Sequence, residues 1–493
     1  MVKKGLPIFS VLLFISTFIT DLLAQTKVFD KIIAKDGTGD YTTISTAISQ
    51  YANSRKVFFI KNGTYKEKIL IDALKTNIRL IGESADGVII TYDDYSGKSV
   101  TSSSTADSYT FRVEGNGFYA ENITFQNTAT QAQAVAIYTK ADTIAFKNCK
   151  FLGYQDTHYA DGGRQYFLNC ETHGDVDFIF GNAAAIYDSS VIISNSRKPG
   201  YVTAPSQAVV TSTKSGGGTN YHGILIKNSK ILAEEGLADN SCCLGRPWGP
   251  YSSSVFYRCK IANHIKPEGW SVWTTDPNDE AYNNYATTVF AEYSNTDTSG
   301  IALNTSQRVT WSSQLTSADT SLYTISEFLK GWDPTIKTTA LSAPTKIYTR
   351  NDSVIWEPIN GARGYVVCRN DSAVGFTVKP GFSIAVKPTQ QFQYRVKSVN
   401  PFGALSKFST VAVPYVPDAV EKVQSQNNEI YCSKDFLFVP ENVKTEIYDL
   451  SGRLMVSNST TKISLLNLKA GIYIIKVYLE NGTAISQKIF KKE

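Results

Sequence analysis

Two aspartates in short, distinctive motifs are the first candidates for chemistry. Asp156 lies in GYQDT (153–157) and Asp177 lies in DVDFIFGN (175–182), 21 residues further on. If the chain repeats with this period, neighbouring repeats present the two carboxylates side by side on one face. Two carboxylates about 5 Å apart cannot both ionise freely, so their pKa values separate. Such a pair divides the work between a proton donor and a nucleophile.

Amide, guanidinium and aromatic groups in nearby motifs could serve the same site. Gln133, in QAVAI, precedes Gln155 by 22 residues, which predicts two carboxamides close to the carboxylates. Arg246, in LGRPWG (244–249), could hold one carboxylate ionised through a bidentate contact. Trp248 and Phe180 are either sugar-stacking platforms or core aromatics. A lone Asp or Gln more often has a structural role, and for Arg246 alone a surface salt bridge has about equal weight, but several such residues in one register favour a site.

A repeat around recurrent asparagines indicates the scaffold. NITF at Asn122, NCKF at Asn148 and NCE at Asn169 are offset by 26 and then 21 residues. A period in the low twenties fits the coils of a parallel β-helix, which stack at the strand spacing of about 4.8 Å. Cys149 and Cys170 are also 21 apart, so a disulfide and a ladder of small buried residues are both open interpretations.

Composition excludes several classes of protein. The 493 residues are 42% hydrophobic and 19% charged, which is not the composition of a disordered, collagen-like or coiled-coil chain. The formal net charge is only +5 and no long Lys/Arg run occurs, so we expect no nucleic-acid partner. Four histidines and no CxxC pair leave little material for a histidine triad or a zinc site.

The N-terminus reads as a targeting signal. Lys3 and Lys4 precede an apolar run to Leu23, which predicts a secretory signal over residues 1–24, removed near Ala24. An uncleaved membrane anchor is the alternative. Export of this kind places the mature protein outside the cell.

The remainder divides into three zones. From Val28 to Pro334, short runs rich in Val, Ile, Phe and Tyr predict many strands and a single helix over 41–51. We place a β-helix catalytic domain at 28–335, a small sandwich at 343–416 and a final β module at 418–493. The expected fold class is all-β: a right-handed parallel β-helix followed by two small β-sandwich modules.

The motifs together resemble one enzyme family. The resemblance is carried by IAKDGTGDYTTISTAI (33–48), GTYKEKI (63–69), QAVAI (133–137), GYQDT, DFIFGNA (177–183), LGRPWG and PEGW (267–270). In order and spacing these segments are similar to those of the pectinesterases, or pectin methylesterases. The similarity covers about residues 28–335, and the combination of GYQDT, DFIFG and GRPW is highly specific.

The resemblance implies a role for each matched residue. Asp177 corresponds to the nucleophile and Asp156 to the general acid, which later acts as the base. Gln133 and Gln155 correspond to the transition-state stabilisers, and Arg246 to the residue that orients Asp177. Substrate contacts are implied for Thr105, Gln133, Phe180, Arg246 and Trp248. The implied mechanism needs neither a metal nor another cofactor.

The implied activity is hydrolysis of the methyl esters of polygalacturonate, with pectin as the macromolecular partner of a monomeric enzyme. Alternatives are another pectin-active β-helix enzyme, such as a polygalacturonase or pectate lyase, and a non-catalytic surface adhesin. Paired carboxylates about 5 Å apart also suit a retaining glycosidase. Release of methanol without new reducing ends or unsaturated product distinguishes these activities.

The two C-terminal modules resemble non-catalytic domains. Residues 343–416 are similar to a fibronectin type III sandwich, with Trp356 and Tyr394 as expected core residues. Residues 418–493 contain TEIYDLSGRLM (445–455) and ISLLNLKAGIYIIKV (463–477) and resemble the sorting domain of type IX secretion cargo. That resemblance implies a secretion-machinery partner and release or attachment at the cell surface. A generic adhesive β-sandwich is the alternative.

Overall fold

The computed structural model describes residues 27–51, 56–206, 223–384, 392–415, 423–425, 428–432, 435–441, 443–479 and 482–491. The expected signal over 1–24 lies outside these residues. None of the helices in the described ranges has the length and apolar character needed to cross a bilayer. The chain forms two compact units, one of Met1–Ile347 with Asn351–Ala412 and one of Tyr348–Arg350 with Val413–Glu493.

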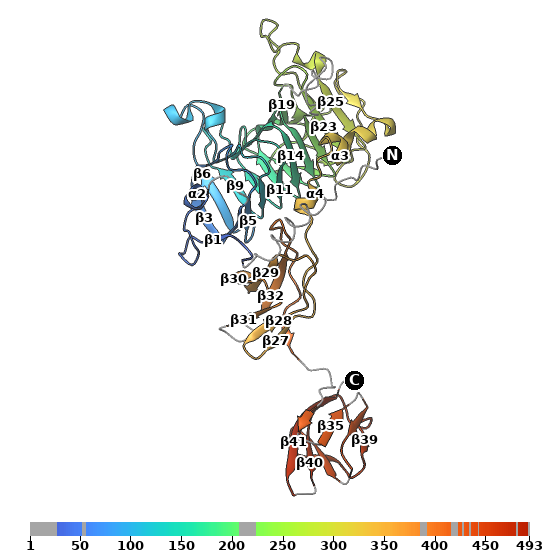
Figure 1. The fold of residues 1–493 in the computed structure, drawn as a ribbon. Coiled ribbons are helices and arrows are strands. Elements are labelled where there is room, and N and C mark those ends of the chain that lie inside the picture. Colours follow the sequence, from blue (N-terminus) through green and yellow to red (C-terminus); the bar gives the residue numbers. More distant parts are fainter. Residues whose placement is uncertain are drawn as a thin grey trace, which may run out of the picture. The chain divides into compact units, whose positions relative to one another are not determined.

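The first unit contains a parallel β-helix, as the repeat predicts, built from three parallel sheets (Figure 1). Sheet 1 consists of β1 (Lys31–Ile33), β2 (Lys56–Ile60), β5 (Ile78–Gly82), β8 (Tyr119–Glu121), β11 (Ile144–Lys147), β14 (Arg164–Leu168), β17 (Ala184–Asp188), β20 (Ile224–Lys227), β23 (Ser253–Tyr257), β25 (Val289–Tyr293) and β26 (Ser313–Gln314). Sheet 2 consists of β3 (Gly63–Lys66), β6 (Val88–Tyr92), β9 (Thr124–Asn127), β12 (Lys150–Leu152), β15 (Glu171–Gly174), β18 (Val191–Ser194), β21 (Lys230–Ala233) and β24 (Lys260–Ile261). Sheet 3 consists of β4 (Ile69–Ile71), β7 (Phe111–Val113), β10 (Ile137–Lys140), β13 (His158–Gly162), β16 (Val176–Gly181), β19 (Tyr201–Pro205) and β22 (Cys243–Gly245).

The recurrent asparagines occupy the turn between sheet 1 and sheet 2. Asn122, Asn148 and Asn169 have φ angles of 57°, 50° and 51°. Each donates its backbone N–H to a carbonyl of the following coil at 3.0–3.1 Å. Asparagine tolerates this left-handed conformation better than most residues. The repeated asparagines therefore mark the position in each of these coils at which the backbone adopts a positive φ angle.

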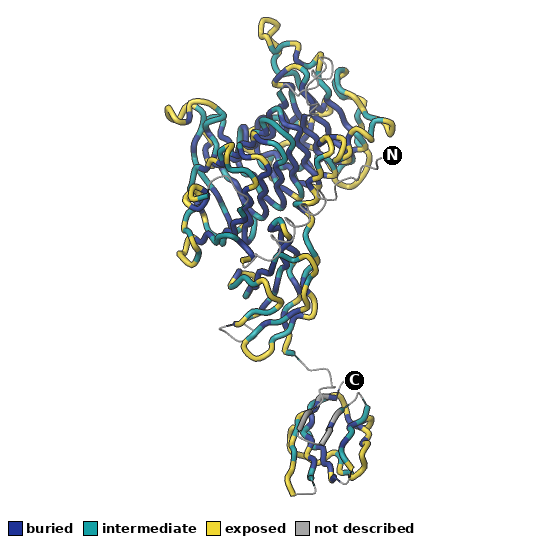
Figure 2. Tube along the Cα trace, in the orientation of Figure 1, coloured by how far each residue is buried: buried dark blue, intermediate teal, exposed yellow. Residues whose placement is uncertain are grey.

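The interior of the β-helix is a stack of side chains from the inward positions of the strands. Aromatic rings such as Phe125, Phe146 and Phe167 are fully buried and pack at centroid separations of 5.3–5.8 Å. Figure 2 shows this interior as a continuous buried band through the coils. Cys149 and Cys170 lie in the same stack as free, buried thiols. The structure therefore agrees with a ladder of small buried residues at Cys149 and Cys170 and not with a disulfide.

A short helix closes the N-terminal end of the β-helix core. The predicted helix is shorter than expected: α2 covers Ile44–Ser49, with Ile44, Ala47 and Ile48 buried. The Glu67 carboxylate accepts hydrogen bonds from the backbone N–H groups of Ile44 and Ser45, both at 2.9 Å. These donors have no partner within the helix, so Glu67 satisfies them. The other described helices are η2 (Val100–Ser102), η3 (Thr105–Asp107), η5 (Asn284–Thr287), η6 (Ser317–Tyr323), α3 (Ile325–Phe328) and α4 (Thr335–Thr338).

A small antiparallel module follows in the same unit. Its strands are β28 (Ser353–Ile355), β29 (Gly364–Arg369), β30 (Ser372–Thr377), β31 (Gly381–Ser383) and β32 (Tyr394–Val399). β29 pairs with β30 and β32, and β28 pairs with β31. Trp356 and Tyr394 are buried in its core, as the sequence predicts.

This middle module packs directly on the outer face of sheet 1. Phe59 and Tyr119 from the β-helix share one apolar cluster with Val366, Val399 and Leu405 from the module. The Glu121 carboxylate accepts a hydrogen bond from the backbone N–H of Leu405 at 3.1 Å. Apolar outward positions on sheet 1 are therefore explained by an intramolecular partner.

The second unit contains the C-terminal β module. β27 (Tyr348–Arg350) pairs with β33 (Val413–Pro414). One antiparallel sheet contains β34 (Val423–Ser425), β35 (Asn428–Cys432), β36 (Phe436–Phe438) and β39 (Lys462–Ser464), and the other contains β37 (Lys444–Asp449), β38 (Leu454–Asn458), β40 (Gly471–Tyr478) and β41 (Ala484–Lys491). Ile447, Ile463 and Ile475 are buried between them. The module thus has a hydrophobic core of its own.

Candidate active site

A cavity of about 440 Å³ on the outer side of sheet 3 brings the predicted site residues together. All eight of them line it: Thr105, Gln133, Gln155, Asp156, Asp177, Phe180, Arg246 and Trp248. Five residues that sequence reasoning missed also line it: Ser104, Ala106, Tyr159, Ala204 and Trp273. The predicted clustering is therefore observed.

The two aspartates occupy equivalent positions in consecutive coils. β13 and β16 pair with His158 opposite Ile179, so residues 21 apart lie side by side. Asp156 and Asp177 precede these strand residues by two positions, and both adopt positive φ angles, 65° and 52°. The Asp156 backbone N–H donates to the carbonyl of Val176 at 3.0 Å, which ties the two turns together. Such strained positions are common at functional sites.

Arg246 holds Asp177 in a fixed orientation. Its Nε donates to Oδ1 at 2.9 Å and its Nη2 donates to Oδ2 at 2.6 Å, a bidentate pair. The guanidinium lies between the rings of Tyr201 and Trp273, 4.1 and 4.2 Å from their centroids. The rings shield the ion pair from water and restrict the rotation of the guanidinium.

The environments of the two carboxyl groups differ. Burial raises the pKa of Asp177, and the hydrogen bonds and charge of Arg246 oppose this rise. Burial and then the neighbouring charge of Asp177 raise the pKa of Asp156 well above its ordinary value. Within the described part of the chain, the Asp156 carboxyl group forms no hydrogen bond. The surroundings therefore favour the protonated form at Asp156 more than at Asp177, because only Asp177 is bonded to a cation.

The two glutamines lie on adjacent turns beside the carboxyl groups. The backbone N–H of Ala134 donates to the carbonyl of Gln155 at 3.1 Å, and that of Ser96 donates to the carbonyl of Gln133 at 2.9 Å. These contacts fix the two backbones. Neither side-chain amide bonds to a described protein group, and both line the cavity. Their N–H groups are thus available to an oxygen of a ligand.

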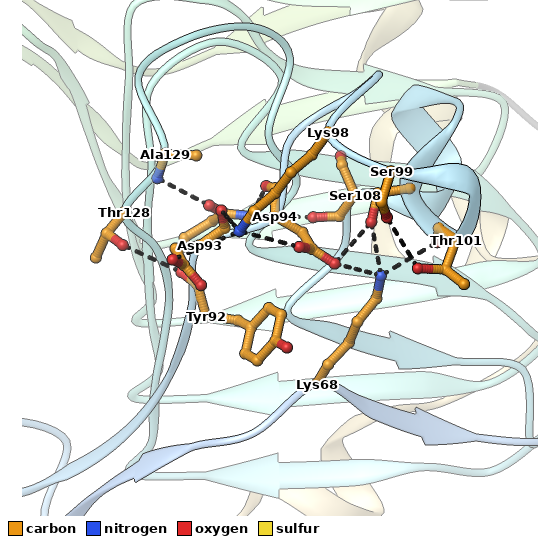
Figure 3. A network of polar contacts seen from close by, with 12 residues as sticks. Lys68, Tyr92, Asp93, Asp94, Lys98, Ser99, Thr101, Ser108, Thr128 and Ala129 are labelled. Carbon is orange, nitrogen blue, oxygen red and sulfur yellow. Dashed lines mark hydrogen bonds and ion pairs between the residues drawn. The ribbon is translucent and has the colours of Figure 1, made fainter.

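A polar network fixes the segment that carries Thr105 (Figure 3). Lys68 Nζ contacts the Asp94 carboxylate at 2.6 Å and donates to the Asp107 carbonyl at 2.7 Å. Lys98 Nζ lies 3.3 Å from the second oxygen of Asp94. Asn127 also bonds the carbonyls of Asp94 and Ser108, at 2.9 and 3.0 Å. One rim of the cavity is thereby attached to the strands of the β-helix.

Stacked aromatic rings form the floor of the cavity. Tyr159 stacks between Tyr138 and Phe180, at centroid separations of 4.7 and 4.3 Å. Trp248 is 37% exposed and meets the edge of this stack, whereas Phe180 is buried. Trp248 therefore presents a face to a ligand, while Phe180 mainly supports Tyr159. The 21-residue period would have identified Tyr159, but no repeat marks Trp273.

Among the described residues, no histidine lines the cavity. Burial lowers the pKa of His158 to about 3, and its Nδ1 lies 2.8 Å from the Tyr187 hydroxyl inside the β-helix core. His264 is also buried, with its pKa lowered to about 4. The arrangement offers a carboxyl group fixed by a guanidinium, a second carboxyl group whose pKa is raised, and two amide donors. It suits acyl transfer through an aspartyl nucleophile.

Two family models match the chain. One described as Pectinesterase matches residues 30–332, and one described as Secretion system C-terminal sorting domain matches residues 426–492. Together they cover the β-helix and most of the C-terminal module.

Similar curated proteins are named as pectinesterases. A pectinesterase of Daucus carota is 38% identical over 57% of this chain and 85% of its own length. The probable pectinesterase/pectinesterase inhibitor 13 of Arabidopsis thaliana is 36% identical over 61% of this chain and 48% of its own length. The chain thus spans about half the length of this relative and of others like it.

Solved structures resemble the β-helix. The pectin methylesterase from carrot has a TM-score of 0.54 at 36% identity, covering 61% of this chain and 93% of its own. That of Erwinia chrysanthemi has a TM-score of 0.51 at 27% identity, covering 62% and 98%.

Proposed function

The chain belongs to the pectinesterase family, and we propose on that premise that it hydrolyses the methyl esters of polygalacturonate to free carboxylate and methanol. The observation that carries the proposal is the pair of buried aspartates, only one of which is bonded to a guanidinium. A pectin methylesterase solved in complex with a hexasaccharide shares the fold at a TM-score of 0.51 and 27% identity. That likeness supports methylated pectin as the substrate.

The first half-reaction forms a covalent intermediate. The Asp177 carboxylate attacks the ester carbonyl carbon, and the negative charge that develops on the carbonyl oxygen receives hydrogen bonds from Gln133 and Gln155. A preorganised donor of this kind is worth about 10²–10³-fold in rate. Asp156 donates its proton to the methoxy oxygen, the C–O bond breaks, and methanol leaves. An anhydride between Asp177 and the galacturonate remains.

The second half-reaction regenerates the enzyme. The Asp156 carboxylate now removes a proton from water, and the hydroxide adds to the galacturonate carbonyl of the anhydride. The same two amides stabilise the oxyanion, and the bond to Asp177 breaks. Asp177 returns to a carboxylate held by Arg246, Asp156 is again protonated, and the galacturonic acid that is released loses its proton to solvent to become the free carboxylate.

Substrate contacts are proposed for the rims of the cavity. Trp248 offers an exposed ring to a sugar face, and Thr105 lines the same cavity from a segment that the Lys68 and Asp94 network fixes. Phe180 acts through its stacking on Tyr159. Arg246 would contact substrate at the same time as it holds Asp177.

A methanol assay on highly methylated pectin tests this function. We expect wild type to release methanol without new reducing ends or unsaturated product, and Asp177→Asn to lose the release while remaining folded. Asp239→Asn, which changes an exposed carboxylate outside the cavity, is the matched control. New reducing ends would indicate a glycosidase and unsaturated product a lyase. No product with any pectin would favour the adhesin.

The C-terminal match indicates a secreted or cell-surface protein. We propose further that residues 343–416 act as a docked support for the β-helix and residues 418–493 as the export module. The mass of the secreted protein tests the second assignment. A chain ending near residue 418 would indicate removal of the module after export, and a chain ending at Glu493 would indicate its retention.

A further inference from the structure

Three consecutive turns lie next to the catalytic groups, and a fourth segment of the chain contacts all three. Gln133 follows the first turn, Gln155 and Asp156 lie on the second, and Asp177 is the second residue of β16, just after the third turn at Asp175. The segment after β18 runs past their outer side. Asn195 in this segment donates to the carbonyl of Gly153 at 2.9 Å.

Arg197 of that segment contacts every one of these turns. Its Nε bonds Asp175 Oδ2 at 2.6 Å, two residues before Asp177. Its guanidinium lies 4.9 Å from the ring centroid of Tyr154, next to Gln155. Its Nη1 donates to the carbonyl of Thr130 at 3.3 Å, on the approach to Gln133.

The contact between Arg197 and Asp175 involves a buried carboxylate. The Asp175 side chain is fully buried. Its Oδ1 accepts a hydrogen bond from the backbone N–H of Val176 at 2.8 Å, and its Oδ2 accepts one from Nε of Arg197. The backbone N–H of Asp175 donates to the carbonyl of Tyr154 at 3.0 Å. A buried carboxylate needs such partners, so the ion pair constrains the turn strongly.

Arg197 lies outside the catalytic cavity. It lines a separate groove of about 510 Å³ together with Tyr154, Lys150, Glu171 and other polar residues. Neither Arg197 nor Asp175 lines the catalytic cavity. Arg197 therefore acts on the site from outside, through the turns that it contacts and through the charge of Asp175, which raises the pKa of Asp156.

We propose that Arg197 is a positioning residue that fixes the relative placement of Gln133, Asp156 and Asp177 by joining the turns that carry them. This role rests on the proposed function. A planar guanidinium presents several N–H donors at fixed angles and a flat face to a ring, whereas the donors of a lysine ammonium all rotate about one nitrogen. A small displacement of reacting groups, about 1 Å, can cost about 10²-fold in rate.

Two substitutions separate this role from a purely structural one. We expect Arg197→Met to lower kcat about 10- to 100-fold with KM within about twofold of wild type. Arg197→Lys preserves a charge beside Asp175 and should recover thermal stability without recovering kcat. The control is Arg164→Met, which removes another partly buried arginine, one bonded to Asp142 at 2.8 Å on a turn between sheets 3 and 1. It should lower Tm with unchanged kcat.

Amide hydrogen exchange supplies a readout independent of activity. The N–H groups of Asp156 and Asp175, which join the second and third turns, should exchange faster in Arg197→Met but not in Arg164→Met. Unchanged kcat or unchanged exchange in Arg197→Met would overturn the proposal. So would full recovery of kcat in Arg197→Lys, or a rise in KM alone. If wild type releases no methanol, the proposed function fails, and exchange alone decides the positioning role.

Discussion

The bond between Arg246 and Asp177 is expected to set both the rate and the acid limit of the reaction. Arg246 donates two hydrogen bonds to the carboxylate, and its own side chain is only 19% exposed. Arg246→Lys preserves the charge but can reach only one oxygen at a time. Arg246→Met removes the charge altogether and leaves a buried carboxylate without its main partner.

The size of each effect follows from these contacts. A hydrogen bond to a charged group is worth about 1.5–3 kcal/mol. Loss of one such bond in Arg246→Lys should lower kcat/KM by roughly 10- to 150-fold, at 1.36 kcal/mol per tenfold. Loss of the whole cation in Arg246→Met should lower the free energy of unfolding by about 3–5 kcal/mol near neutral pH.

The direction of the pH effect is also determined. Asp177 must be ionised to attack, burial already raises its pKa, and Arg246 is the main group that opposes this rise. Without the guanidinium, the pKa of Asp177 rises further, because among the described residues the charge of Lys198 is then the main influence that still lowers it. A smaller fraction of Asp177 is then ionised in acid, so the acid limb of the rate profile moves to higher pH.

Initial rates of methanol release across pH, measured on methylated pectin for wild type, Arg246→Lys and Arg246→Met, test this reasoning. Arg112→Met is the control, because Arg112 lies on the same sheet over the ring of Tyr138 and bonds Glu114 instead. Its acid limb should match that of wild type. An acid limb that is unmoved, or moved to lower pH, in Arg246→Met would refute the reasoning.

Three further predictions concern the proton donor, the cavity rim and the docked module. Asp156→Asn should lower methanol release at least about 10²-fold, since the general acid and base is lost. The pKa of Asp156 is raised in the folded protein, so wild type loses stability as the pH rises from the ordinary carboxyl pKa through the raised one. Thermal melts at pH 8 should therefore give a higher Tm for Asp156→Asn than for wild type. The difference in Tm should close near pH 4. Lys68→Met should raise KM several-fold with little change in kcat in pectin titrations, because it loosens the segment of Thr105; an unchanged KM would argue against that segment as a binding rim. Leu405→Ala should lower the free energy of unfolding by about 2–5 kcal/mol in denaturant titrations if the module is docked, whereas a change below about 0.5 kcal/mol would mean that the interface contributes nothing.

Features that return once per coil could be predicted from the sequence. Asn148 and Asn169 mark a backbone turn that only a few residue types tolerate, so the period appears directly in the residue letters. The same period places Asp156 beside Asp177, because strand pairing fixes the register between adjacent coils. Trp356 and Tyr394 could likewise be assigned to a core, since large aromatics in short strands are buried.

Contacts between segments that do not share the period could not be derived this way. Arg246 is 69 residues from Asp177 in the sequence, and only the family motif linked the two residues at that level. In the structure, Arg246 Nη2 lies 2.6 Å from Asp177 Oδ2. Trp273 and Arg197 carry no repeat, and their roles depend on how loops outside the coils return to the sheets.

The sequence by itself determined the β-helix and the register that places Asp156 beside Asp177, because the period of the coils is visible in the spacing of the motifs. Only the tertiary structure decided that Cys149 and Cys170 form a ladder of free thiols, and that the middle module covers sheet 1 through Tyr119 and Leu405. It also decided that the two carboxyl groups have unlike surroundings, because burial acts on the pKa of both while Arg246 reaches only Asp177 with hydrogen bonds, and both effects depend on the packed structure.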